Sequence, residues 1–183
     1  MPKADFYRYF LGFRPEPDLR RRLAAIGERA GQRVQVELLH LTLCVMAETP
    51  DRDYLLWPRV QSALAVHPLS SFFFQLGSVK GGPDGARIDS AGGQNATQDF
   101  YRALISLLAQ RDITPLYRES GLRAHVTLGH APCPVERCKA PVQWCPADLL
   151  LIESEVGLSR HNVVGRWPLL PPLQGSLPFA RQS

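Results

Sequence analysis

The sequence predicts an α+β fold with a mainly antiparallel sheet. Strand-like and amphipathic helical segments follow one another, but without the strict strand–helix–strand repetition that a parallel sheet requires. A tetrapeptide of the form H-x-T-L occurs twice, at residues 40–43 and 125–128, each time within an apolar, alternating run. If the repeat reflects two similar halves, a pseudo-twofold axis would bring the two His-Thr pairs face to face across a cleft.

The first half of the chain contains two predicted helices between strands. An aromatic, alternating run predicts the opening strand, and Asp18 is a suitable N-cap for the helix that follows. Pro58 lies within the second helical pattern, and because proline removes a helical hydrogen-bond donor we expect that helix to restart there. The predicted elements are a strand at 5–13, a helix at 18–30, a short strand at 33–37, a strand at 38–45 and an interrupted helix ending near 67.

The second half repeats this mixture. A glycine-rich turn between two alternating runs predicts a hairpin, and an apolar stripe at helical spacing predicts a long helix after it. The predicted elements are strands at 69–79 and 86–90, a helix from 95 or 97 to 111, a strand at 122–128, one or two strands within 142–156 and a last strand at 163–170.

Length and composition indicate one globular domain. The chain has 183 residues, of which 45% are apolar and 21% charged, and this is ordinary for a folded protein. We expect a single domain of two lobes over 1–172 and a loose, proline-containing tail over 173–183. The net charge of +4 is compatible with a phosphate-bearing partner, although the excess is modest.

The sequence contains no apolar run of membrane-spanning length and no signal-peptide core, so we expect a cytoplasmic protein without a membrane partner. Cysteines would be reduced there. Cys133, Cys138 and Cys145 lie close together in sequence and could form a zinc set with His130. Their spacing lacks the paired C-x-x-C of structural zinc sites, so we expect no metal.

The two repeated tetrapeptides provide the candidate chemistry. Successive side chains of a strand point to opposite faces, so His40 and Thr42 share one face, and so do His125 and Thr127. Histidine can donate or accept a proton near neutral pH. Threonine hydroxyls on the same face can donate hydrogen bonds to phosphoryl oxygens, which gain charge in a transition state.

These motifs and their flanks resemble the two-histidine (2H) phosphoesterases, and in particular the bacterial branch named 2′-5′ RNA ligase or RNA 2′,3′-cyclic phosphodiesterase. The resemblance covers nearly the whole chain and keeps the order of the segments. It includes R-Y-F-L-G-F-R-P at 8–15, L-H-L-T-L at 39–43, H-V-T-L at 125–128, L-L-L-I-E-S-E-V at 149–156 and R-W-P-L at 166–169.

The resemblance implies two antiparallel sheets that form a cleft, with helices packed outside. It implies hydrolysis of RNA 2′,3′-cyclic phosphate ends to 2′-phosphates without a metal or nucleotide cofactor, and the reverse reaction would give a 2′,5′ linkage. His40 would be the proton donor and His125 the acceptor, although the local symmetry would let these roles exchange. We expect a monomer whose partner is RNA or a nucleotide with a 2′,3′-cyclic phosphate.

Two positions depart from the family pattern. An arginine usually follows the second motif, giving H-x-T-L-x-R, whereas this chain has His130, and His161 stands where the family often has tyrosine. Arginine is a permanent, forked cation suited to phosphate, so phosphate affinity or substrate choice would be altered. The residues that could supply the missing charge are Arg8, Arg123 and Arg160, each of which could equally be a solvated surface arginine.

Two further alternatives stay open at this stage. Phe10 matches an aromatic position of the first strand, where it could stack on a base or pack in the core. The chain could also act on 2′,5′-oligoadenylate or a small cyclic nucleotide phosphate, or it could be a non-catalytic nucleotide-binding module.

Overall fold

The computed structural model describes residues 3–91, 95–116, 122–134 and 138–172, and the predicted tail at 173–183 lies outside them. Eight strands form one sheet in the order β6-β3-β4-β5-β2-β1-β7-β8, and all of its neighbouring strand pairs are antiparallel. The α+β, mainly antiparallel fold is therefore confirmed.

The strands are β1 (Phe6–Phe13), β2 (Leu41–Thr49), β3 (Phe74–Gly82), β4 (Gly85–Ser90), β5 (His125–Gly129), β6 (Cys138–Trp144), β7 (Asp148–Val156) and β8 (Arg160–Pro168). The helices are α1 (Pro17–Arg29), the short 3-10 helix η1 (Val36–Leu38), α2 (Leu56–Leu64) and α3 (Asn95–Ala109).

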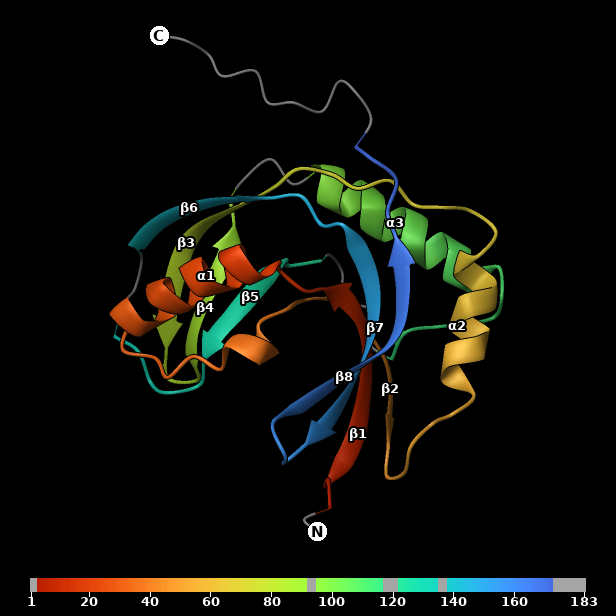
Figure 1. The fold of residues 1–183 in the computed structure, drawn as a ribbon, viewed down its shortest axis with the longest axis horizontal. Helices are drawn as coiled ribbons and strands as arrows, with labels where there is room; N and C mark the ends of the chain where they lie inside the picture. Colours follow the sequence, from red (N-terminus) through yellow and green to blue (C-terminus); the bar gives the residue numbers. More distant parts are fainter. Residues whose placement is uncertain (1–2, 92–94, 117–121, 135–137, 173–183) are drawn as a thin grey trace, which may run out of the picture.

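The sheet divides into two halves of four strands, which meet between β2 and β5 (Figure 1). One half contains β6, β3, β4 and β5, and the other contains β2, β1, β7 and β8. The two halves are arranged alike, because in each of them the strand of the H-x-T-L motif, β2 or β5, is the one at the junction. Between β2 and β5 only Leu41 and Val126 are paired in the described structure, whereas the pairs within each half extend over several residues. The two predicted sheets are thus two halves of one sheet, joined by a short contact.

Helix α1 lies against the half that contains β3, β4 and β5 (Figure 1). Its first turn contains a proline, as a first turn tolerates, and Gly31 follows its end with a φ of 74°, a conformation that glycine adopts without strain. Gly27 allows close packing, because a Cβ at this position would lie 3.2 Å from the Cβ of Leu128 on β5.

Helices α2 and α3 lie beside the other half of the sheet (Figure 1). Phe100 of α3 packs edge-on against Phe13 of β1, with ring centroids 5.3 Å apart, and also contacts Phe72 at 5.2 Å. Apolar side chains from both halves of the sheet and from all three α-helices form one continuous core. A stable core of this kind fixes the strands on which the candidate site is built.

Four local predictions were wrong. Asp18 is not the N-cap of α1 but lies in its first turn, because the helix starts at Pro17 with Glu16 as its N-cap. The segment predicted as a short strand at 33–37 is a coil that runs into η1, so the chain turns before it enters β2. Strand β2 begins at Leu41, and His40 lies immediately before it rather than inside it. The helix expected to restart at Pro58 instead starts at Leu56, where the Asp53 carboxylate accepts hydrogen bonds from the backbone N–H groups of Leu55 and Leu56.

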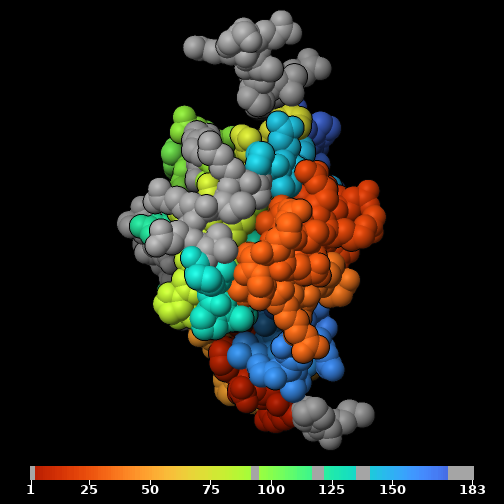
Figure 2. Space-filling model, turned by 90° about the vertical axis from the view of Figure 1, so that its left-hand side faces the viewer, coloured from red at the N-terminus to blue at the C-terminus, as the bar shows by residue number. Residues whose placement is uncertain are grey.

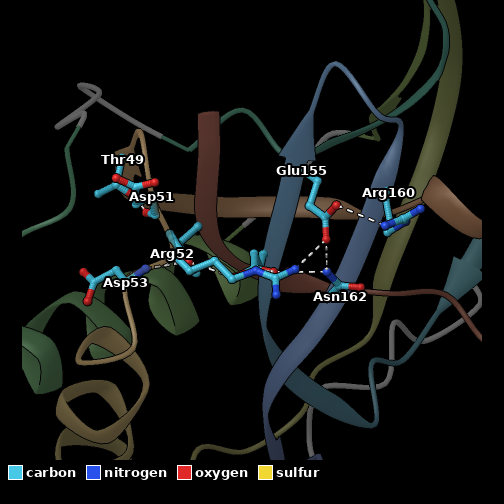
Figure 3. Close-up of polar contacts among 9 residues, drawn as sticks. Thr49, Asp51, Arg52, Asp53, Glu155, Arg160 and Asn162 are labelled. Carbon is cyan, nitrogen blue, oxygen red and sulfur yellow. Dashed lines mark hydrogen bonds and ion pairs between the residues drawn. The ribbon is translucent and has the colours of Figure 1, made fainter. Parts of the chain in front are cut away.

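A polar network surrounds Glu155 of β7 (Figure 3). The side chains of Glu153 and Glu155 are 7% and 5% exposed, respectively. Arg52 donates to Glu155 at 2.8 Å and lies 3.3 Å from Glu153, while Asn162 donates to Glu155 at 2.8 Å. Arg160 donates to the second oxygen of Glu155 at 3.2 Å. The pKa of Glu155 is lowered, first by the hydrogen bond from Asn162 and then by the two arginines.

Among the described helices, none is both long and apolar enough to cross a membrane.

Candidate functional site

A hollow of about 590 Å³ opens where the two half-sheets meet. The segments that line it include β1, β2, β5, β7, β8 and the coil after α1, and several of them come together on the face shown in Figure 2. It contains five of the six side chains that the sequence singled out, namely Phe10, His40, Thr42, Thr127 and His130. The sixth, His125, is not among the residues that line the hollow and lies on β5, two residues before Thr127.

The pairing of Leu41 with Val126 brings the two motifs side by side. Both side chains are buried in the core, so the residues that flank them point to the opposite face. Continued by one residue in each direction, this antiparallel register sets His40 opposite Thr127 and Thr42 opposite His125. His40 and His125 are then at diagonal positions, whose Cα atoms lie about 7–8 Å apart in a regular sheet.

Both histidines use the same nitrogen in the same way. Nδ1 of His40 donates to the carbonyl oxygen of Leu38 at 2.6 Å, and Nδ1 of His125 donates to that of Arg123 at 2.8 Å. In each case the acceptor lies two residues earlier in the chain. Because the carbonyl can only accept, the proton stays on Nδ1, and Nε2 is left to accept or donate a proton.

His40 is held more firmly than His125. Its ring lies 4.6 Å from the ring of Phe10 and 4.9 Å from that of His161, measured between centroids. The pKa of His40 is lowered, mainly because burial penalises its charged form and further because Arg14 and His125 carry like charge nearby. His40 is therefore predominantly neutral at pH 7 in the free protein.

His161 of β8 also lines the hollow. Its ring contacts both His40 and Phe10, with centroids 4.9 Å and 5.6 Å away. Burial lowers its pKa to about 4, with smaller contributions from His40 and Arg14. Its Nδ1 is buried without a partner in the described structure. His161 is thus a neutral side chain that supports His40.

His130 is exposed at the rim of the hollow. The chain directly after it is fixed by Gln32, a buried residue that follows α1. The Gln32 amide donates to the carbonyl of Ala131 at 3.0 Å and accepts from its N–H at 3.1 Å. Gly129 leaves room for this amide, since a Cβ there would lie 2.8 Å from the Cβ of Gln32. A two-point hydrogen bond therefore fixes the backbone that carries His130.

Phe10 lines the hollow and is only 3% exposed, with Leu150 and Ile152 as its neighbours in a small cluster apart from the main core. It packs against His40 and borders the cavity, so its burial agrees with the packing role, while stacking on a base stays a prediction.

The three arginines considered as replacement cations differ in their positions. Arg8 lines the hollow, but its Nε donates to Glu48 at 2.5 Å. Arg160 donates to Glu155 at 3.2 Å. Arg123 is exposed and precedes β5, and its backbone carbonyl is the acceptor for His125.

Sequence reasoning missed Arg14, which follows β1 directly. Its Nε and Nη2 are buried and have no partner among the residues that the structure describes. Its charge lowers the pKa of both His40 and His161, so it lies near both rings. In the sequence Arg14 is only a polar residue at the end of an aromatic strand, and this pattern does not show which side chains lie next to it.

Sequence reasoning also missed a charged cluster beside the second motif. Arg87 is paired with Thr127 and Asp89 with His125 in the β4–β5 register. Asp89 forms ion pairs with Lys80 of β3 and with Arg87. The alternation of Arg87 and Asp89 with apolar Ala86 and Ile88 was visible, but the strand that neighbours them was not.

The described side chains include no group of three or more His, Cys, Asp or Glu that could hold a metal ion. Of the zinc set considered from sequence, the Cys133 thiol is buried and donates to the carbonyl of Ala30 at 3.3 Å. Cys145 is exposed and lies 3.2 Å from the Ser71 hydroxyl. The Cys138 side chain lies outside the described part.

Comparison with solved structures gives matches over most of the chain. The protein TT0787 of Thermus thermophilus matches with a TM-score of 0.67 and 18% identity, over 88% of this chain and 97% of that one. Escherichia coli LigT in its apo form matches with a TM-score of 0.69 and 16% identity, over 91% and 99% of the two chains. LigT complexed with 3′-AMP gives a TM-score of 0.69 and 16% identity, over 90% of this chain and 98% of that one.

No protein-family model matches the sequence, and comparison with curated proteins also gives no significant match. At identities this low, the structural matches establish the fold, which is that of LigT, and nothing beyond it.

Proposed function

We propose that the chain is a 2H phosphoesterase that hydrolyses RNA 2′,3′-cyclic phosphate ends to 2′-phosphates, with His40 and His125 as general acid and base. One observation carries the proposal: the two H-x-T-L segments, distant in sequence, meet at the junction of the half-sheets, and within the described part of the chain each histidine uses Nδ1 for its hydrogen bond and has no partner at Nε2. Two imidazoles at about diagonal spacing can flank one phosphorus atom from opposite sides.

In the proposed reaction the acceptor histidine removes a proton from water, and the resulting oxygen forms a bond to phosphorus. The bond between phosphorus and the ribose 3′ oxygen breaks, and the donor histidine protonates that oxygen. The products are a 2′-phosphate and a free 3′ hydroxyl. Thr42 and Thr127, which line the hollow, would hydrogen-bond the phosphoryl oxygens as these gain charge.

The roles implied by the family resemblance make His40 the donor and His125 the acceptor. A donor must be protonated before the reaction, yet burial keeps His40 neutral in the free protein. Binding of an anionic phosphodiester beside His40 would reverse this preference, because a nearby negative charge stabilises the imidazolium. We therefore expect His40 to take up its proton when the substrate binds. The same reaction run backwards with a 5′-hydroxyl end would form a 2′,5′ linkage.

The test is turnover of a nucleoside 2′,3′-cyclic phosphate in the presence of EDTA by the wild type and by His40→Ala and His125→Ala. Each variant should lose at least about 100-fold in rate while remaining folded, since each removes one proton-transfer group. His67→Ala is the matched control, because His67 is exposed and distant in the fold from both motifs, beside the end of α2. Full activity in either site variant would remove that histidine from the mechanism.

A nucleotide-binding module is the second candidate. It is favoured by the solved structures of LigT, which include complexes with 3′-AMP, ATP and phosphate. Binding of AMP without cleavage of either a 2′,3′-cyclic or a 2′,5′-linked substrate would support it against the hydrolase. Cleavage of only the 2′,5′-linked substrate would instead support an oligoadenylate phosphodiesterase.

A further inference from the structure

Three charged side chains lie next to the second motif, on the strands beyond it. Arg87 and Asp89 alternate with the buried residues Ala86 and Ile88, so both point to the face opposite the core. The β4–β5 register pairs Arg87 with Thr127 and Asp89 with His125. Directly paired residues of neighbouring strands extend their side chains on the same face. Arg87 is therefore a lateral neighbour of Thr127 on the face that carries both histidines.

Asp89 holds Arg87 in one orientation. Its carboxylate accepts a hydrogen bond from the Nε of Arg87 at 3.0 Å and forms an ion pair with Lys80 through its other oxygen. This contact occupies the Nε of the guanidinium. The two terminal nitrogens have no partner in the described structure, so they can bind a ligand. The side chain of Arg87 is 50% exposed, so a ligand from solvent can reach it.

The site has a place for such a cation. The family pattern has arginine after the second motif, and this chain has His130 there, exposed at the rim. Two of the described arginines line the hollow: Arg8 is engaged with Glu48 through its Nε, and Arg33 is exposed on the coil after α1. Arg87 is a permanent cation, and a guanidinium can bind two phosphate oxygens at once.

We propose that Arg87, oriented by Asp89, binds the phosphate group of the substrate beside Thr127 and replaces the arginine that the second motif lacks. The inference rests on the proposed function for the identity of the substrate, but its basis is the strand register and the Asp89 contact. Lys80, paired with the same carboxylate, adds positive charge to this side of the site.

The experiment compares Arg87→Met with Arg87→Lys. Methionine keeps much of the length and apolar stem of the side chain without the charge, whereas lysine keeps the charge without the fork. Arg102→Met is the matched control, because Arg102 is an exposed arginine on α3 that pairs with Asp99. The probes are a nucleoside 2′,3′-cyclic phosphate for KM and kcat, and a nucleoside 2′-phosphate for binding by calorimetry.

Arg87→Met should raise both KM and the dissociation constant of the 2′-phosphate by about 10- to 100-fold, the range expected for one charged hydrogen-bonding group. Arg87→Lys should lie between Arg87→Met and the wild type, and Arg102→Met should stay within about twofold of the wild type.

Unchanged KM and affinity in Arg87→Met, with an active wild type, would overturn the assignment of Arg87 and leave the proposed function standing. If the wild type cleaves no cyclic phosphate, the proposed function fails, and binding of the 2′-phosphate alone decides the inference. Binding that weakens in Arg87→Met supports it then, whereas unchanged binding, or no binding by the wild type, overturns it.

Discussion

Leu41 and Val126 are paired across the junction of the two half-sheets, and their side chains are 1% and 0% exposed. The residues on either side of these two are the histidines and threonines of the candidate site. The same short contact therefore joins the halves of the fold and sets the spacing of the two motifs.

Truncation at this junction should cost stability. Leu41→Ala is expected to lower the free energy of unfolding by about 3 kcal/mol, because it removes a buried leucine and leaves a cavity. Urea denaturation of the two proteins measures the difference. The partly exposed Val163 of β8 provides the control, and Val163→Ala should change stability by less than about 0.5 kcal/mol. An equal effect of the two substitutions would contradict a packed junction.

The network around Glu155 should make stability depend on pH in acid. The pKa of Glu155 is lowered in the folded chain, so the fold favours its ionised form. This contribution is fully present above the ordinary glutamate pKa and is lost as the pH falls through the lower, folded value. Glu155→Gln should therefore be less stable than the wild type at pH 7, and the difference should shrink steadily below about pH 4.5.

Urea denaturation at a series of pH values measures this difference. Val163→Ala, which changes no ionisable group, serves as the control, and its difference from the wild type should not shrink in acid. A gap between Glu155→Gln and the wild type that stays constant down to about pH 3 would contradict the role of ionised Glu155.

Much of the fold could be predicted because its strands and helices are marked by strong local patterns. The alternation around His125, the aromatic opening strand and the apolar stripe of α3 all gave the correct element type. Residues 33–37 also alternate, but they form no strand, because the chain there makes the turn into η1 before β2 begins. Alternation alone cannot distinguish a strand from an extended coil that has no partner.

The sequence likewise predicted some residues of the candidate site and missed others. The five lining residues predicted from sequence belong to or flank the two motifs, apart from Phe10, which the family likeness supplied. Arg14, Arg87 and Asp89 were missed because their significance depends on strand neighbours. The pairing of β4 with β5 crosses the whole of α3, and no local pattern in the sequence specifies such a long-range register.

His130 should contribute to substrate binding. It is exposed at the rim of the hollow, close in sequence to Thr127, where its ring nitrogens can hydrogen-bond a phosphate oxygen. We expect His130→Ala to raise the KM for a nucleoside 2′,3′-cyclic phosphate by about 3- to 10-fold, the loss expected for one hydrogen bond. An unchanged KM would exclude His130 from substrate binding.

Proton uptake on binding distinguishes the roles of the two histidines. His40 is neutral in the free protein because burial, Arg14 and His125 lower its pKa. A cyclic phosphodiester carries a single charge that does not titrate near neutrality, so any proton taken up at pH 7 must go to the protein. If His40 is the donor, binding should be coupled to uptake of a substantial fraction of one proton.

The measurement is calorimetry in two buffers of different ionisation enthalpy. It uses His125→Ala, because this variant should bind a nucleoside 2′,3′-cyclic phosphate but cleave it slowly. The apparent binding enthalpy should then differ between the buffers, and the difference should vanish in the His40→Ala, His125→Ala double variant. A persisting difference would place the proton on another group, such as His161. Binding without any uptake would mean that His40 enters the reaction neutral, and the acceptor role would then belong to it.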